Sequence, residues 1–225
     1  MNLPHIDFKD GTVEVLKWIA LFIMTLDHIN KYYFHEKITL IFDLGRVALP
    51  IFLIILAYNL ARPGALENGV YGRVMNRLLV SGLIAIIPIT LMGGLIGGWW
   101  PLNIMFLLLV VTATAYLIDT HHPIIAQIVF FLGGAVVEFW WFAGLLGVAV
   151  WWYCRKPNWT AAILILISWG SLWIVNQNSW AFAALPLIWI VSRLPVEMPK
   201  YKYVFYTYYP LHLAIICLVV NYKNF

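Results

Sequence analysis

Nine apolar runs separated by short polar breaks constrain the fold of this chain more than any motif does. They lie at about residues 15–34, 39–61, 74–97, 102–119, 122–138, 140–154, 160–176, 179–192 and 203–221. Of the 225 residues, 63% are hydrophobic and only 11% are charged, which is more apolar surface than a soluble domain can bury. The sequence therefore predicts an all-α, polytopic integral membrane bundle of about nine transmembrane helices. The short runs at 122–154 and 160–192 also allow eight or ten spans.

The breaks are too short to hold a soluble domain, so residues 15–225 are predicted to form a single membrane domain after a cytoplasmic segment, residues 1–14. Loop charge predicts the orientation, because Lys and Arg accumulate on the cytoplasmic side. With the N-terminus inside, the predicted cytoplasmic basic residues are Lys9, Lys17, Arg62, Arg73, Arg77, Arg155, Lys156, Arg193, Lys200 and Lys202, against Lys31, Lys37 and Lys223 outside. This asymmetry favours a chain with its N-terminus inside and its C-terminus outside.

Ionisable side chains within the predicted spans are the main candidates for a functional site, because a charge in hydrocarbon costs at least a few kcal/mol. Lys17 and His28 lie eleven positions apart in the first span. This spacing is close to three helical turns, so both project from one helix face, about 16 Å apart along the axis. The predicted threading brings further polar residues of four spans into one outer to mid-depth layer: Asp27, Asp43, Arg46, Asn103, Tyr206, Tyr208, Tyr209 and His212.

His28 is the predicted catalytic base, because a neutral imidazole held by a second group suits proton transfer near neutral pH. Asp27 is adjacent and points about 100° away on a helix, so it cannot easily orient His28. Asp43 is a better candidate for that role, and Asp27 is then a candidate partner for Arg46. Asp43 and Arg46 are three residues apart, which also permits an ion pair within one helix. These four residues form the predicted catalytic group.

The remaining candidates are predicted to bind substrates. Lys17, Asn103, Tyr208 and His212 are predicted to contact the substrate, although helix capping explains Asn103 equally well and an interfacial aromatic belt explains the tyrosines. Arg62, Arg73 and Arg77 suit a phosphate clamp, and the loop-charge bias explains them too.

Two further observations limit the classes of function. No set of residues with metal-ligand spacing surrounds His121, His122 or Glu138, so no metal site is predicted. The net charge of +4 reflects the loop cations, so nucleic-acid binding is not predicted.

Three segments resemble the TraX family, named for the conjugative-plasmid enzyme that acetylates the amino terminus of F-type pilin. They are LKWIALFIMTLDHI at 16–29, LGRVALPIF at 44–52 and YTYYPLHL at 206–213. The first segment is also similar to the wider acyltransferase-3 membrane superfamily, whose signature is a basic residue, ten intervening residues and a histidine. Lys17 and His28 have this spacing, with lysine where the superfamily usually has arginine. Lysine lacks the planar fork of arginine.

The resemblance implies a membrane-embedded acyltransferase in the bacterial inner membrane, with acetyl-CoA as acyl donor and His28 as base. The implied acceptor is the amino-terminal amine of a pilin precursor or another envelope substrate. The CoA phosphates would dock near Arg62, Arg73 and Arg77. Arg46, Asn103 or a tyrosine would donate to the oxyanion. Two different functions stay open: O-acylation of a glycan, and a small proton-coupled transporter, since proton relays also use intramembrane ionisable residues.

Overall fold

The computed structural model describes residues 3–96, 98–201 and 203–223, and within them every regular element is helical apart from two isolated β-bridges. Two residues named in the predictions lie outside the described residues: Gly97 of the predicted span 74–97 and Lys202 of the predicted cytoplasmic cations. The helices are α1 (Asp10–Tyr32), α2 (Thr39–Gly45), α3 (Ala48–Ala61), α4 (Val70–Leu91), α5 (Ile104–Asp119), α6 (Pro123–Val136), α7 (Trp140–Arg155), α8 (Trp159–Asn176), the 3-10 helix η1 (Trp180–Ala183), α9 (Ala184–Arg193) and α10 (Val204–Lys223).

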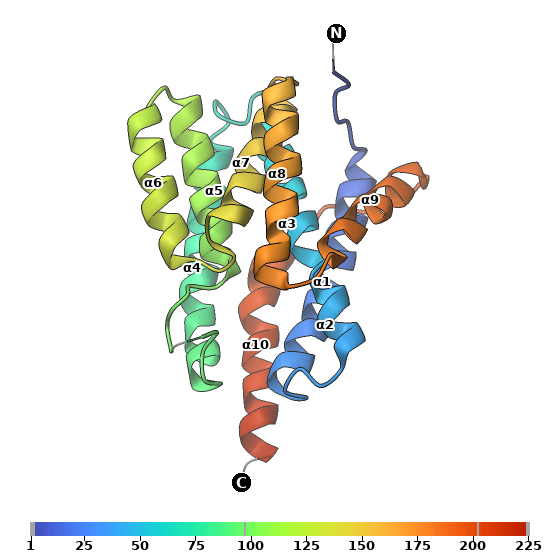
Figure 1. Cartoon of the computed structure of the whole chain (residues 1–225), viewed down its shortest axis with the longest axis vertical. Helices are drawn as coiled ribbons and strands as arrows, with labels where there is room; N and C mark the ends of the chain where they lie inside the picture. The colour runs from blue at the N-terminus through green and yellow to red at the C-terminus, as the bar shows by residue number, and fades with distance from the viewer. Residues whose placement is uncertain (1–2, 97, 202, 224–225) are drawn as a thin grey trace.

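Among the described residues, four helical segments are long and apolar enough to cross a membrane: Thr39–Ala61, Val70–Leu91, Trp159–Asn176 and Val204–Tyr222. Shorter apolar helices at Ile104–Asp119, Pro123–Val136 and Trp180–Arg193 accompany them. Many large apolar side chains on these helices are exposed, as expected for surfaces that face lipid rather than water. The chain is therefore a helical membrane protein. The N-terminal residues and the C-terminal end of α10 lie at opposite ends of the long axis (Figure 1).

Helix boundaries differ from the predicted ones where the chain bends. The predicted span 39–61 consists of α2 and α3, with a break between Gly45 and Ala48. Pro50 follows this break in the first turn of α3, where a missing backbone N–H costs little. The proline therefore marks the start of a helix rather than a kink within one. Helix α1 begins at Asp10, so the predicted cytoplasmic segment 1–14 already includes its first turn.

The packing of α1 decides where the polar residues meet. This helix lies against α2, α3 and α10, and α10 also packs along α4 (Figure 1). At the contact with α2, a Cβ atom added to Gly45 would lie 2.4 Å from the Asp27 Cγ. Only a residue without a side chain allows α2 to approach α1 this closely.

Candidate functional site

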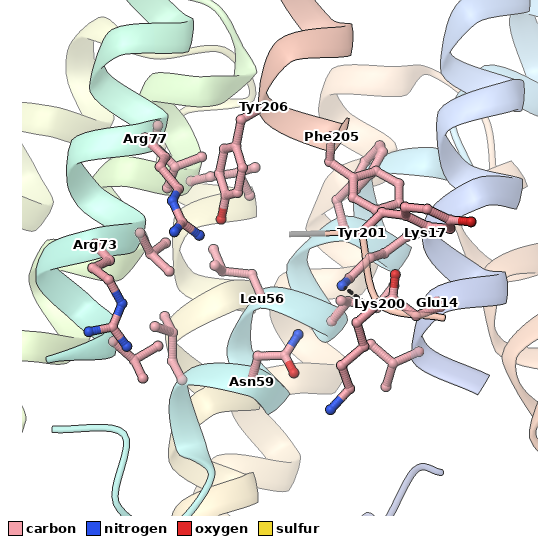
Figure 2. A pocket seen from close by; sticks show the side chains of 18 of the residues that line it. Glu14, Lys17, Leu56, Asn59, Arg73, Arg77, Lys200, Tyr201, Phe205 and Tyr206 are labelled. Carbon is pink, nitrogen blue, oxygen red and sulfur yellow. Dashed lines mark hydrogen bonds and ion pairs between the residues drawn. The ribbon is translucent and has the colours of Figure 1, made fainter. Parts of the chain in front are cut away.

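A large pocket opens between α1, α3, α4 and α10. We call it the basic pocket; its volume is about 720 Å³, within the ~300–1,000 Å³ range of small-molecule sites. Figure 2 shows Arg73 and Arg77 of α4 on one side of the pocket, with Lys17 of α1 and Lys200 of the α9–α10 link on the other. Its basic lining residues are Lys17, Arg62, Arg73, Arg77 and Lys200. The fold thus brings together every cation that the sequence suggests for phosphate binding.

Carboxylates at the pocket partly neutralise these cations. Asp10 accepts from Arg62 and Lys200, each at 2.7 Å. Hydrogen bonds from Lys200 and Arg62 lower the pKa of the Asp10 carboxyl, which lies outside the apolar part of α1. Deeper along α1, Lys17 donates to Glu14 at 2.7 Å. The pocket therefore holds five cations and two carboxylates, and its lining is positively charged.

The pocket changes from polar to apolar along α1, α3 and α4, and α5 adds only apolar residues to its lining. Along α1 the lining begins with Asp10, Glu14 and Lys17 and continues to Leu21 and Met24. The same order holds on the neighbouring helices: Arg73 and Arg77 precede Leu78 on α4, and Asn59 precedes Leu56, Ile55 and Phe52 toward the start of α3. Such a lining suits a ligand with an anionic head and a less polar arm.

His28 and His212 form a hydrogen-bonded pair beyond the apolar end of the pocket. The His28 Nδ1 lies 2.7 Å from the His212 Nε2, and the two rings are nearly parallel. Tyr209, which lines the basic pocket, has its ring centroid 6.1 Å from that of His28 and 5.5 Å from that of His212. Met24, one helical turn before His28, lines the pocket as well. The imidazole pair is therefore one side chain away from the cavity.

The hydrogen bonds of the neutral pair specify which ring nitrogens carry protons. The His212 Nδ1 lies 2.9 Å from the Tyr208 carbonyl oxygen, which only accepts, so this nitrogen is the protonated one. The His212 Nε2 is then an acceptor, and the His28 Nδ1–H donates to it. The His28 Nε2 is consequently left unprotonated, as a general base requires. His212 thus orients His28, a role that the sequence does not suggest.

Arg46 pairs with Asp27, one of the two carboxylates predicted for it. Its NH2 group donates to both Asp27 carboxylate oxygens at 2.9 Å, and its Nε donates to the Phe42 carbonyl oxygen. Both roles predicted for Asp43 are wrong: it neither orients His28 nor pairs with Arg46, because its Oδ1 accepts from the Asn178 side chain at 3.0 Å. The break after Gly45 turns Arg46 toward α1, whereas Asp43 faces the α8–η1 link.

Asn103 and Tyr208 have structural partners. The Asn103 Oδ1 accepts from the Met105 N–H at the start of α5, and its Nδ2 donates to the Gly82 carbonyl oxygen at 3.0 Å. This is the helix-capping role that explains Asn103 without a substrate. The Tyr208 hydroxyl lies 3.0 Å from the Thr25 hydroxyl, which itself donates to Leu21. Neither residue lines the basic pocket.

Sequence reasoning gave no place in the site to Glu14 and Glu138, and it placed Tyr209 in the polar layer without a specific role. Glu14 lines the basic pocket with its side chain only 4% exposed, and its Oε2 has no hydrogen-bond partner. Its spacing of three residues from Lys17 was the signal that could have identified it. Tyr209 separates the pocket from the imidazole pair. Glu138 approaches Tyr209 and Tyr32 from the α6–α7 link, a position that no local pattern indicates.

These features define the class of protein: a helical membrane protein with a basic pocket that ends beside a buried imidazole pair. The family described as TraX protein matches residues 12–220, and the chain belongs to that family. The comparison thus confirms the resemblance seen in the three segments.

One curated relative is the uncharacterized protein RP591 of Rickettsia prowazekii (strain Madrid E). It is 30% identical over 84 residues, which is 37% of this chain and 29% of the relative. The chain thus matches less than a third of that protein's length. No solved structure matches the chain.

Proposed function

We propose that this protein is a membrane-embedded, acyl-CoA-dependent acyltransferase of the bacterial inner membrane. Its acceptor is the amino-terminal amine of a pilin-like or other envelope protein, and its donor is acetyl-CoA. One observation carries the proposal: a cation-lined pocket continues along apolar side chains to Tyr209, which contacts an imidazole whose unprotonated nitrogen suits a base. Membership of the TraX family supports it, because the family is named for such an acetylating enzyme.

The basic pocket suits the chemical parts of the donor in their order along the molecule. The phosphates and ribose carry the negative charge, and they match the end lined by Arg62, Arg73 and Arg77. The pantetheine arm is uncharged, and it matches the apolar stretch from Leu21 to Met24. Lys17 and His28 are about 16 Å apart along α1, a distance that an extended arm can cover. The thioester end then lies beside Tyr209, next to the imidazole pair.

The proposed reaction is direct transfer. The acceptor amine attacks the thioester carbonyl carbon, and a new C–N bond forms as the nitrogen gives its proton to the His28 Nε2. The tetrahedral adduct then collapses with cleavage of the C–S bond. His28 returns the proton to the departing thiolate, so the products are an amide and free coenzyme A. Of the candidates for stabilising the oxyanion, Arg46 already donates to Asp27 through its Nη2 and Asn103 caps α5.

The decisive experiment uses the purified full chain in detergent with radiolabelled acetyl-CoA and peptides that carry a free amino terminus. The wild-type protein is expected to transfer label to the peptide but not to its N-acetylated counterpart. His28→Ala is expected to lower kcat by about 100- to 10,000-fold, the usual contribution of a general base, without changing the Kd for acetyl-CoA. His5→Ala, which replaces an exposed histidine, serves as the control.

Three results would contradict the proposal. Undiminished transfer by His28→Ala would show that His28 is not the base. Transfer to a saccharide hydroxyl but not to a peptide amine would point to O-acylation of a glycan. Proton uptake into vesicles without any acyl transfer would point to a transporter.

A further inference from the structure

A second, smaller cavity lies beside the imidazole pair, and the reaction described above gives it no role. We call it the charged pocket; its volume is about 150 Å³, and Lys31, Arg46 and Glu138 line it together with Phe139 and Trp140. The three charged residues come from α1, from the α2–α3 break and from the α6–α7 link. It shares no lining residue with the basic pocket.

The backbone around Glu138 is held in an unusual conformation. Its N–H donates to the Leu102 carbonyl oxygen at 2.9 Å, and the Leu102 N–H donates to Val136 at 2.7 Å. The two residues that follow, Phe139 and Trp140, have φ angles of 59° and 48°. Bulky side chains rarely adopt this left-handed conformation, which costs on the order of 1–3 kcal/mol each and is concentrated at functional sites. The fold thus fixes the position of Glu138 at some cost in stability.

Within the part of the chain that the structure describes, two charges of this pocket lack a partner of opposite charge. Among the described residues, neither Lys31 nor Glu138 belongs to an ion pair within 4.0 Å, whereas Arg46 is engaged by Asp27. Lys31 has its ammonium 5.7 Å from the ring centroid of Tyr32. A cation and a carboxylate that line one small cavity suit a ligand with both a hydrogen-bond donor and an acceptor oxygen.

The charged pocket is also close to the proposed base. Lys31 follows His28 by three residues on α1, so the two side chains lie on the same helix face, and Arg46 pairs with Asp27, the residue directly before His28. On the other side, Tyr209 lines the basic pocket and contacts both rings of the imidazole pair, and Met24, one helical turn before His28, lines the same pocket. His28 therefore lies between the two cavities, as a base must when it moves a proton from one substrate to the leaving group of another.

We propose that the charged pocket is the acceptor site and that it binds the amino terminus of a peptide, an inference that rests on the acyltransferase function proposed above. The Glu138 carboxylate accepts a hydrogen bond from the amine, and the Lys31 ammonium donates to the carbonyl oxygen of the first residue. The small volume selects a first residue with a small side chain, and the rest of the peptide extends outward.

The test compares Glu138→Gln with the wild-type protein and with Glu197→Gln, which changes an exposed glutamate. Tetrapeptides that begin with Gly, Ala, Leu or Trp are the acceptors, and acetyl-CoA is the donor. Glu138→Gln is expected to raise the KM for the Gly and Ala peptides about tenfold, because the hydrogen bond from the amine loses its charged acceptor. The KM for acetyl-CoA is expected to stay within about twofold. The wild-type protein is expected to prefer Gly and Ala over Leu and Trp.

Lys31→Met provides a second variant, which also tests the acceptor site if Glu138→Gln does not yield a monodisperse protein. Lys31→Met is expected to raise the KM for the Gly peptide more than the KM for propylamine, which has the amine but no carbonyl. Equal effects of Glu138→Gln and Glu197→Gln, or a wild-type preference for Trp peptides, would overturn the acceptor site while leaving the acyltransferase intact. A wild-type protein that transfers to no amine at all would overturn the proposed function itself.

Discussion

The basic pocket and the imidazole pair hold their polar groups in different ways. Two cations of the basic pocket, Arg62 and Lys200, have an exposed partner: the Asp10 side chain, with which both pair, is 52% exposed. His212, by contrast, is only 4% exposed and is fixed by two hydrogen bonds in a chain that runs from a backbone carbonyl to His28. An exposed ion pair exchanges partners readily, whereas a buried hydrogen-bond chain does not.

This difference suits two separate tasks. A pocket that must capture and release an anionic ligand needs cations whose present partners can be displaced. A base must present the same unprotonated nitrogen at the start of every turnover, which requires a fixed tautomer. Substitutions in the two regions should therefore change different kinetic constants: KM in the basic pocket and kcat at the imidazole pair.

Among variants that keep His28 itself, the largest effect is expected at His212. His212→Gln keeps a polar side chain but lacks the ring that links the Tyr208 carbonyl to the His28 Nδ1, so the tautomer of His28 is no longer specified. We expect kcat to fall about 10- to 100-fold, with an altered pH profile of kcat and an unchanged KM for acetyl-CoA.

Tyr208→Phe is the matched control for this substitution. It removes the hydroxyl that contacts Thr25 but keeps the backbone carbonyl that orients His212. We expect it to retain kcat within about threefold, since the tautomer is unaffected. A pH profile of His212→Gln that matches that of the wild type would show that His212 is only a packing residue.

The next largest effect is expected for stability, at the contact between α1 and α2. In Gly45→Ala the new Cβ would lie 2.4 Å from the Asp27 Cγ, so α2 must move and the Asp27–Arg46 pair is strained. We expect a loss of about 2 kcal/mol in the free energy of unfolding, measured by denaturation in detergent. Gly72→Ala is the control, because a Cβ there meets nothing within 4 Å. Equal stability of the two variants would show that α2 adapts without cost.

The contrast between these regions also explains which parts of the site the sequence could predict. The helical class and the cations of the basic pocket follow from apolar runs and loop charge, which are properties of single segments. The position of His28 on the same face as Lys17 follows from helical periodicity. These predictions needed no knowledge of which helices touch.

Partner identity depends on helix packing, and there the sequence was ambiguous or misleading. Asp27 rather than Asp43 pairs with Arg46 because the chain bends after Gly45, and no periodicity indicates the direction of that bend. The contact between His28 and His212 joins residues 184 positions apart. Glu138 comes from a link between helices, so only the assembled bundle shows that it lies near the imidazole pair.

A smaller effect is expected for donor binding at Arg77, whose guanidinium carbon lies 4.6 Å from the ring centroid of Tyr203 on the wall of the basic pocket. Arg77→Ala is expected to raise the KM for acetyl-CoA about tenfold and to leave kcat within about twofold. Arg193→Ala, which removes an arginine that packs on Trp189 outside this pocket, should change neither constant. A fall in kcat with an unchanged KM would show that Arg77 acts in the reaction and not in donor binding.

The smallest effect is expected at Asp10, and it has the opposite sign. Asp10→Asn releases Arg62 and Lys200 from their carboxylate, so both cations become available to the phosphates of the donor. Exposed ion pairs contribute little, so we expect the KM for acetyl-CoA to fall only about two- to threefold, with a steeper dependence on salt. The wild-type pairing should not change between pH 5 and 9 (about one unit or more above the ordinary pKa of the group), because a lowered pKa keeps the carboxylate ionised throughout. The interaction would be lost only as the pH falls through that lowered pKa. Titrating acetyl-CoA at two salt concentrations measures the effect, and a higher KM in Asp10→Asn would mean that Asp10 positions the two cations instead of competing for them.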